Sequence, residues 1–319
     1  MNAIEIKDLK KSFFVKGKNI EAVKGINLSV EQGEVFGFLG PNGAGKTTSL
    51  RMLTTLLPID EGEAKIFGYD VKRNPKEVRR HIGYVGQLGG TDIEATGREN
   101  LMLSSMLYGM TRESARKQSE SLIELLELNN IIDRIAKTYS GGQRRRLEIA
   151  LGILHHPDVL FLDEPTTGLD PQNRTNLWNH IRQLKAAGMT VFLTTHYLEE
   201  ADELCDRLCI MDKGIIIAEG TPSELKQQIS GDMVTIILKK DHMDIETIFD
   251  GNSDVLNINV EGKKIKLYVR NGAIAMPDIF DIIKSNDIEL ETISLSQPSL
   301  DDVFLRQTGK SLRDTGGTF

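Results

Sequence analysis

A lysine and two threonines follow a cluster of glycines near the N-terminus, a combination suited to binding phosphate groups. Glycines allow successive backbone N–H groups to turn toward one point, and the N-terminus of a following helix adds partial positive charge there. A lysine in this position can reach the β- and γ-phosphates of a nucleotide, and the next threonine hydroxyl can ligate Mg²⁺. The pattern G-x-x-x-x-G-K-[ST] is met by the segment Gly40-Pro41-Asn42-Gly43-Ala44-Gly45-Lys46-Thr47-Thr48. The alternative interpretation is an ordinary tight turn that carries a surface lysine.

The residues on either side of this segment favour phosphate binding over a chance match. Val35–Leu39 is a short apolar run, which is typical of a buried strand. Leu50, Leu53 and Leu57 then recur at helical spacing, which predicts a helix that packs back on that strand. Strand, glycine-rich loop and helix in this order are the context that the phosphate-loop interpretation requires.

Polar side chains also follow three later apolar runs. Asp163 and Glu164 come directly after the run Val159–Leu162. Because open α/β sheets bind their ligands at the carboxyl ends of strands, we expect these two carboxylates at a ligand site. Gln87 and His196 likewise end two other short apolar strands.

Two further features could contact a nucleotide. The segment Ser140-Gly141-Gly142-Gln143 precedes a predicted helix, so it is a second candidate for anion binding at a helix N-terminus. Phe13 or Phe14 could stack on an adenine ring, which is typically worth about 1–3 kcal/mol per base. Both phenylalanines could instead be core residues of a strand, and the periodicity leaves that choice open.

Composition indicates a soluble globular protein that works in the cytoplasm. Of 319 residues, 39% are hydrophobic and 27% are charged, and the N-terminus has no signal-peptide pattern. No apolar stretch approaches the ~20 residues that a membrane span needs. The net charge of −7 argues against a broad nucleic-acid surface. Cys205 and Cys209 lack two further ligands nearby in sequence, so we expect buried thiols rather than a metal site.

The chain divides into regions of different pattern. Residues 98–137 look helical, which places a helical subdomain at about 88–157 within a first domain of residues 1–228. Residues 229–308 follow the order β-α-β-β-α-β, which predicts a small ferredoxin-like α+β domain. A capping box at Ser299 and Asp302 predicts a last helix, and residues 309–319 are expected to be a flexible tail.

The ordered set of motifs resembles the nucleotide-binding subunit of ATP-binding cassette (ABC) transporters. The set comprises Gly40–Thr48, Gln87, Ser140–Gln143, Leu160–Glu164, Gly168-Leu169-Asp170 and His196. The remainder is similar to the C-terminal extension of drug- and antibiotic-export subunits of the daunorubicin-resistance type, through the closing segment 297–304. The expected fold is therefore a phosphate-loop α/β domain of ABC type with a helical subdomain, followed by the small α+β domain.

The resemblance implies ATP and Mg²⁺ as cofactors. For catalysis it implies Glu164 as general base, His196 as the residue that steadies the γ-phosphate, and Gln87 as a sensor of Mg²⁺ and of the attacking water. Thr47 and Asp163, with Gln87, are implied to hold Mg²⁺. It assigns nucleotide contacts to Phe13 (Phe14 as the alternative), Asn42, Gly43, Ala44, Gly45, Lys46, Thr47, Thr48, Ser140, Gly141, Gly142, Gln143 and Asp170.

The same resemblance implies partners and a location. One chain has one phosphate loop and one Ser140–Gln143 signature, so a second copy or a homologous ATPase is needed to complete each ATP site. The resemblance also implies that this chain binds a separate membrane permease at the cytoplasmic face of the cell membrane, and that it has no nucleic-acid partner.

The sequence departs from the family pattern in two places: Tyr139 replaces the commonest leucine before the signature, and Gly89-Gly90 follows Gln87 where bulkier residues are common. A ribosome- or nucleic-acid-directed cassette ATPase, or an ATP-gated regulatory module, is the alternative function.

Overall fold

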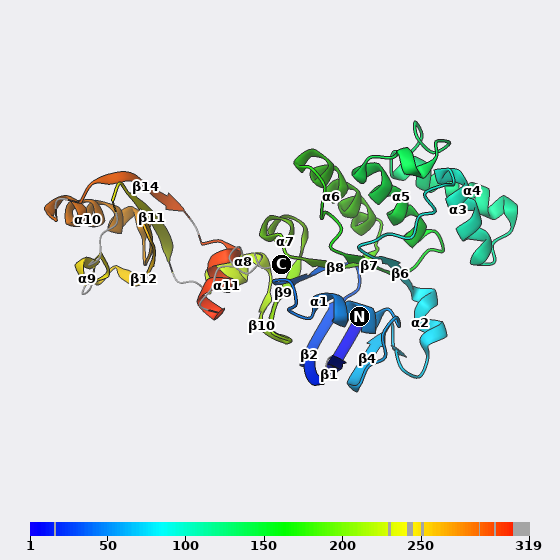
Figure 1. Cartoon of the computed structure of the whole chain (residues 1–319), viewed down its shortest axis with the longest axis horizontal. Coiled ribbons are helices and arrows are strands. Elements are labelled where there is room, and N and C mark those ends of the chain that lie inside the picture. Colours follow the sequence, from blue (N-terminus) through cyan, green and yellow to red (C-terminus); the bar gives the residue numbers. More distant parts are fainter. Residues whose placement is uncertain are drawn as a thin grey trace. The chain divides into compact units, whose positions relative to one another are not determined.

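The computed structural model describes residues 1–15, 17–228, 231–240, 245–249, 252–286, 288–296 and 298–308, and these form two compact units (Figure 1). The first unit comprises Met1–Thr221, and the second begins at Pro222. No helix in the described ranges is both long and apolar enough to cross a membrane.

A six-stranded sheet forms the centre of the first unit. Its strands pair in parallel, except for the antiparallel pair at one edge, β9 and β10. The register aligns Asp163 with Thr194 and Leu39 with Thr195, so three strands end at the same edge of the sheet. In sheet order the strands are β10 (Ile215–Gly220), β9 (Arg207–Asp212), β3 (Val35–Leu39), β8 (Thr190–Thr195), β7 (Val159–Asp163) and β6 (Ile82–Val85).

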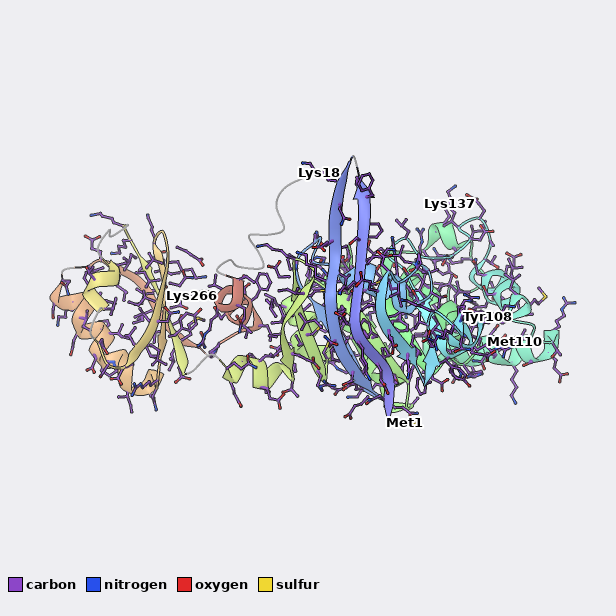
Figure 2. The ribbon with its side chains drawn as sticks, turned by 90° about the horizontal axis from the view of Figure 1, so that it is seen from below. Met1, Lys18, Tyr108, Met110, Lys137 and Lys266 are labelled. Atoms are coloured by element: carbon purple, nitrogen blue, oxygen red, sulfur yellow. The ribbon has the colours of Figure 1, made fainter. Side chains whose placement is uncertain are left out.

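A second, antiparallel sheet packs against the first through an apolar core. Its order is β2 (Lys18–Glu31), β1 (Asn2–Val15), β4 (Glu61–Ile66) and β5 (Tyr69–Asp70). Figure 2 shows β1 and β2 as one long hairpin with Lys18 near its tip. The buried rings of Phe36, Phe38, Phe161 and Phe192 lie in the core that the two sheets share. The hairpin thereby reaches past the edge where the parallel strands end.

The helices of the first unit largely follow the sequence expectations, with two corrections. The predicted helix after the phosphate loop ends at Leu53, so Leu57 lies beyond it, although Leu57 still packs against the core. Residues 98–137 are not one helical stretch, because the chain leaves the first helix at Tyr108 and restarts after the N-cap Thr111. The helices are α1 (Lys46–Leu53), α2 (Pro75–His81), α3 (Gly97–Leu107), α4 (Arg112–Leu125), the 3₁₀ turn η1 (Ala136–Thr138), α5 (Gly141–Ile153), α6 (Pro171–Ala186) and α7 (Leu198–Leu204).

The second unit contains an antiparallel sheet in the order β12-β13-β11-β14. Helix α10 packs on it through the buried side chains of Ala275, Ile279 and Ile283. Residues 243 and 244 of the predicted first helix, residue 297 of the closing segment and the tail from residue 309 lie outside the described residues. The elements are α8 (Pro222–Gln227), β11 (Asp232–Leu238), α9 (Ile245–Phe249), β12 (Val255–Glu261), β13 (Lys264–Val269), α10 (Gly272–Ser285), β14 (Leu290–Ser296) and α11 (Leu300–Thr308).

A buried carboxylate holds the last helix, α11, to the sheet of its own unit. Ser299 and Asp302 form the predicted capping box, and one Asp302 oxygen also accepts hydrogen bonds from Lys266 Nζ (2.9 Å) and the Tyr268 hydroxyl (3.1 Å). Burial alone would raise the pKa of Asp302, but the bonds from Ser299 and Lys266 outweigh it and leave that pKa below its usual value. Leu300, Val303 and Phe304 of α11 are buried, and α11 packs against α8.

We expect Lys266→Met to destabilise the second unit by about 3 kcal/mol, because it leaves the Asp302 charge buried without its cation. The difference from the parent should shrink as pH falls through the pKa of Asp302, since protonation removes the charge in both proteins. Hydrogen exchange of the β11–β14 amides measures this, while fluorescence of the single Trp178 follows the first unit. Lys264→Met, at an exposed position of the same strand, is the control, and an equal loss there would contradict the assignment.

Candidate active site

The phosphate loop is shaped by its glycines and by the carbonyl groups around it. Strand β3 ends at Leu39, and α1 begins at Lys46. Gly45 has φ 109°, and a Cβ there would lie 2.5 Å from the carbonyl oxygen of Ala22. No other residue type fits this position, because both the dihedral angle and the close approach exclude a side chain. The loop amides before α1 are thereby directed toward the helix N-terminus, as anion binding requires.

A cavity of about 400 Å³ collects residues that are far apart in the sequence. Gln87 and Glu164 approach it from the ends of β6 and β7, and Phe13 approaches it from the β1–β2 hairpin. Phe14 is 80% exposed and is not among the described residues that line this cavity, so the structure favours Phe13 as the stacking aromatic. The remaining lining residues are Ala22, Asn42, Gly43, Ala44, Gly45, Lys46, Thr47 and Thr48.

The Lys46 ammonium lies at the centre of this loop. Its Nζ donates to the carbonyl oxygens of Gly40 (2.6 Å) and Pro41 (3.0 Å), and it lies 3.8 Å from Glu164 Oε1. Burial lowers the pKa of Lys46, while the charges of Glu164 and Asp163 act in the opposite direction. A cation held in this way can move a short distance to an anionic ligand without a large change in the loop.

The carboxylate of Asp163 has the features of a cation ligand. Its Oδ1 accepts hydrogen bonds from the hydroxyls of Thr47 (2.9 Å) and Thr194 (2.7 Å). Its Oδ2 is buried and has no hydrogen-bond partner among the described residues. An unsatisfied buried carboxylate oxygen is costly, and a hard divalent cation such as Mg²⁺ prefers oxygen ligands of this kind. Asp163 and Thr47 therefore fit Mg²⁺, and Gln87 lies on the same cavity.

Glu164 is held in an unusual backbone conformation. Its φ is 47°, in the left-handed region that non-glycine residues rarely adopt. Its N–H is shared between the carbonyl (3.1 Å) and hydroxyl (3.0 Å) oxygens of Thr194. The Thr167 hydroxyl donates to Oε2 at 3.2 Å, and His196 Nδ1 lies 3.3 Å from the same oxygen, without good hydrogen-bond geometry. Burial raises the pKa of Glu164, but His196 and the Lys46 charge outweigh it, so the pKa lies below its usual value and the carboxylate is ionised at neutral pH.

The second glycine-containing segment lies elsewhere in the same unit. Ser140 caps α5 through a capping box with Gln143, and Asp170 caps α6 by accepting from the Asn173 N–H at 2.9 Å. Helices α5 and α6 pack against each other. None of Ser140–Gln143 or Asp170 is among the described residues that line the 400 Å³ cavity. The structure thus separates the predicted nucleotide contacts into two groups within one chain.

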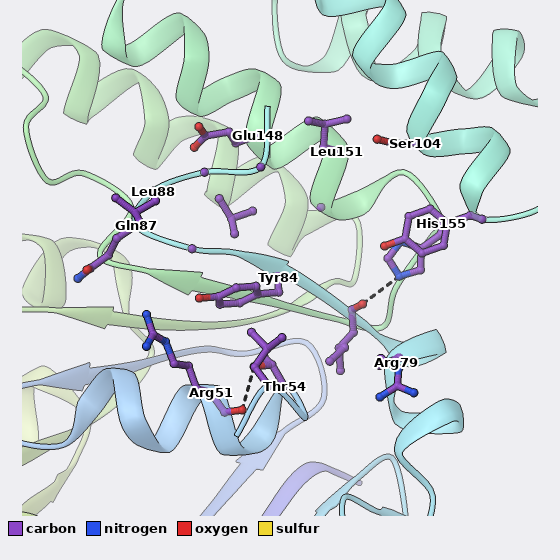
Figure 3. Close-up of a pocket in the computed structure, with 18 of the residues that line it drawn as sticks. Arg51, Thr54, Arg79, Tyr84, Gln87, Leu88, Ser104, Glu148, Leu151 and His155 are labelled. Carbon is purple, nitrogen blue, oxygen red and sulfur yellow. Dashed lines mark hydrogen bonds between the residues drawn. The ribbon is translucent and has the colours of Figure 1, made fainter. Parts of the chain in front are cut away.

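A larger groove of about 1020 Å³ begins at Gln87 and runs between α1 and α2 on one side and α3 and α5 on the other (Figure 3). Gly89, with φ 69°, lies in its wall, and a Cβ there would come within 1.9 Å of Glu148 Oε1. The unusual Gly89 found in the sequence is therefore required by the carboxylate packed against it. The groove and the smaller cavity share Gln87.

Sequence reasoning missed two residues of this site. Thr194 bonds both Asp163 and Glu164, and its only sequence signal is a polar residue in an apolar strand. Arg145, on α5, is buried and hydrogen-bonds to backbone carbonyls near Gln87 and Glu164. Its signal would have been two charged residues of opposite sign, Arg145 and Glu148, one turn apart on the buried face of that helix.

Comparison with known proteins gives consistent matches along the chain. The family model described as ABC transporter matches residues 23–167, and that described as the C-terminal domain of ATP-binding protein DrrA1-3-like matches residues 220–308. The chain is 41% identical to the daunorubicin/doxorubicin resistance ATP-binding protein DrrA of Streptomyces peucetius, covering 98% of this chain and 96% of that protein. It is 33% identical to the linearmycin resistance ATP-binding protein LnrL of Bacillus subtilis, covering 98% and 100%.

A solved structure supports the fold of the first unit. The dimeric post-hydrolysis state of the ATP-binding cassette MJ0796, bound to ADP and Pi, has a TM-score of 0.62 and 27% identity. The match covers 68% of this chain and 98% of that one.

We expect Lys46→Ala to weaken ATP binding about 10–100-fold, because a charge-assisted contact to phosphate is lost. The fold should survive, since among the described residues the hydrogen bonds of Nζ go to two carbonyl groups of its own loop and its ion pair is with Glu164 of the same site. Titration with a fluorescent ATP analogue and the melting temperature measure the two effects. Lys18→Ala, near the hairpin tip in Figure 2, is the control, and normal turnover in Lys46→Ala would refute the role given to this lysine.

Proposed function

The chain belongs to the ATP-binding proteins of ABC transporters, in the daunorubicin/doxorubicin resistance group, and from that premise we propose how its residues serve drug export. It is the ATP-binding and ATP-hydrolysing subunit of a transporter that exports a drug or antibiotic. The observation that carries this function is that the phosphate loop and an ionised glutamate line one cavity, and that Thr47 of the loop hydrogen-bonds a buried aspartate, Asp163, whose second oxygen has no partner among the described residues.

The exported molecule belongs to the class of small or lipophilic antibiotics. Two relatives that match along nearly the whole chain are named for resistance to chemically different antibiotics, daunorubicin/doxorubicin and linearmycin. A shared ATPase with different substrates is expected when the membrane permease selects the substrate. We therefore assign specificity to the permease and the energy supply to this chain.

Each residue of the cavity has a role in phosphoryl transfer. The loop amides and Lys46 hold the phosphates, and the ring of Phe13 stacks on adenine. Thr47 and Asp163 hold Mg²⁺, which neutralises charge on the phosphate oxygens. Glu164, ionised and facing the cavity, accepts a proton from the attacking water.

Gln87 and His196 complete the hydrolytic site. Gln87 lines both cavities, so it is suited to orient the water and to respond to events in the groove. His196 lies 3.3 Å from the Glu164 carboxylate, where it can steady the γ-phosphate beside the base. This positioning, together with charge neutralisation, supplies most of the catalysis in phosphoryl transfer.

A complete ATP site needs two chains. The Ser140–Gln143 signature does not line the phosphate cavity of its own chain in the described structure, and Ser140 and Gly141 are exposed. We infer a head-to-tail dimer with a second copy or a homologous ATPase, in which each signature meets the ATP held by the other chain. Asp170 lies at the cap of the helix that packs on the signature helix, so it is suited to communicate between the two sites.

The groove in Figure 3 is our candidate docking site for the permease. Leu88 is fully exposed there, Tyr108 and Leu151 line other parts of the groove, and Arg51, Arg79 and Arg80 lie along the wall formed by α1 and α2. Apolar residues flanked by cations suit a short amphipathic helix with acidic residues. Such docking holds the chain at the cytoplasmic face of the membrane as a peripheral subunit.

For the second unit we propose a ferredoxin-like fold and an accessory role. The strand order β12-β13-β11-β14, with every neighbour antiparallel, supports that topology. The sequence boundary at residue 228 assigned α8 to the first domain, whereas α8 packs on α11 in the second unit. We therefore favour a boundary near Thr221, and a regulatory or dimer-contact role for the unit.

We expect Glu164→Gln to bind ATP but to hydrolyse it about 10²–10⁴-fold more slowly, since the general base is lost. Without hydrolysis, ATP should hold two chains together. Size-exclusion chromatography with and without Mg-ATP measures the dimer, and the parent protein with ADP is the control. Unimpaired turnover in Glu164→Gln would show that Glu164 is not the general base.

We expect Leu88→Asp to abolish drug resistance in cells that contain the permease, because a charge is placed on the docking surface. The ATPase activity of the isolated chain should remain, since Leu88 makes no part of the phosphate loop. Leu107→Asp, at a leucine of α3 that is 80% exposed and is not among the groove-lining residues described, is the control. Co-purification of the permease with Leu88→Asp at the parental level would exclude the groove as the docking site.

A further inference from the structure

A single buried guanidinium joins three segments around the active site. Arg145, on the first turns of α5, is 6% exposed. Its Nε donates to the carbonyl oxygen of Pro165 (2.9 Å), and Nη2 donates to that of Asp163 (3.0 Å). Its Nη1 donates to the carbonyl oxygen of Gly86 (2.7 Å) and to Glu148 Oε2 (2.9 Å). Four hydrogen bonds thus leave one side chain in a fixed orientation.

Two of these bonds lie on either side of the general base. Pro165 and Asp163 flank Glu164 in the chain, and the guanidinium holds both of their carbonyl groups. Glu164 itself has a left-handed backbone, with its N–H bonded to Thr194. A non-glycine residue remains in this conformation only when its surroundings hold it there. Arg145 and Thr194 together supply that restraint, so the direction of the Glu164 side chain depends on Arg145.

The third bond reaches the segment that carries Gln87. The carbonyl of Gly86, the residue before Gln87, accepts from Arg145 Nη1. Glu148, 8% exposed and one turn along α5, binds the same Nη1 and packs with its other oxygen against Gly89. The loop from Gly86 to Gly89 is therefore held at both ends by one ion pair of α5. Figure 3 shows the Glu148 carboxylate beside the loop that carries Gln87 and Leu88.

We propose that Arg145, oriented by Glu148, is a positioning residue for ATP hydrolysis that aligns Glu164 and Gln87 together. Both belong to α5, whose N-terminus is the Ser140–Gln143 signature. A shift of α5 when the signature meets the other chain's ATP would move the base and Gln87 as one unit. This inference rests on the proposed ATPase function.

Lysine cannot replace Arg145 in this role. A guanidinium presents planar donors in a fixed fork, which here bond three carbonyl groups and a carboxylate. An ammonium keeps the charge but lacks that geometry. Arg145→Lys therefore tests positioning while the charge beside Glu148 is preserved.

The chain offers a matched control on the same helix. Arg146 Nη1 also donates to two carbonyl groups, those of Leu126 (3.1 Å) and Glu127 (3.2 Å), and contacts the Glu127 carboxylate at 3.4 Å. In the part of the chain that the structure describes, these partners lie in the helical subdomain and not beside Glu164.

We expect Arg145→Lys to lower kcat on the order of 10²-fold, with ATP affinity within about threefold of the parent. Arg146→Lys should stay within about twofold in kcat. Equal activities of the two variants would overturn the proposal.

A double-mutant cycle separates positioning from a general loss of structure. If Arg145 acts through Glu164, Arg145→Lys should reduce turnover by a smaller factor in a Glu164→Gln background than in the parent. Additive losses would show that Arg145 does not act through the base and would overturn the proposal. If Glu164→Gln itself hydrolyses ATP normally, the role proposed for Glu164 as general base is wrong, whereas parental activity in Arg145→Lys alone contradicts only this inference.

Two substitutions cover the case in which Arg145→Lys does not fold. Gly89→Ala forces the Glu148 carboxylate away, because the new Cβ would lie 1.9 Å from its Oε1. Gly90→Ala is its control, since a Cβ there meets nothing within 4 Å and the backbone needs no left-handed conformation. We expect kcat to fall about tenfold or more in Gly89→Ala at unchanged ATP affinity, and to be unchanged in Gly90→Ala. Parental kcat in Gly89→Ala would contradict the role of the Arg145–Glu148 pair.

Discussion

The fully buried carboxylate of Asp163 is the constraint on which the active site depends. A charge at this depth is stable only with partners, and Thr47 and Thr194 supply two hydrogen bonds to the same oxygen. Those partners come from α1 and β8, so the end of β7 must lie between the phosphate loop and the next strand. The parallel register that pairs Asp163 with Thr194 satisfies this requirement. The other carboxylate oxygen has no hydrogen-bond partner among the described residues, which suits the cation that we propose for this site.

Two adjacent carboxylates then take different roles because their backbones differ. Asp163 ends a regular strand and faces inward, whereas Glu164 adopts a left-handed conformation and faces the cavity. Backbone strain of this kind typically costs on the order of 1–3 kcal/mol and is concentrated at functional sites. The strained residue is held by Thr194 on one side and by the Arg145 guanidinium on the other. The orientation of Glu164 is therefore coupled, through these hydrogen bonds, to the position of α5, the helix that begins at the signature.

Sequence reasoning recovered what local pattern controls. The strand before the phosphate loop, the helix after Ser140 and the capping box at Ser299 follow from short-range residue spacing, and the structure confirms them. The helical character predicted for residues 98–137 is confirmed for α3 and α4, but not for the turns at 126–135. Periodicity could not choose between Phe13 and Phe14, since the cavity that Phe13 lines is formed by segments far apart in the sequence; stacking on adenine stays a prediction. Arg145 and Thr194 were missed because their partners are distant in sequence, and no local pattern reports a contact across 59 or 31 residues.

The central claim, that each ATP site is built from two chains, is tested most directly by mixing two inactive variants. Lys46→Ala lacks a working phosphate loop, and Ser140→Arg lacks a working signature. A mixed dimer of the two has one doubly defective site and one intact site. Random mixing makes about half of the dimers mixed, each with one of its two sites intact, so ATPase activity should return to about a quarter of the parental value. Activity that stays at the level of the separate variants would contradict the claim, because it would mean that loop and signature act within one chain.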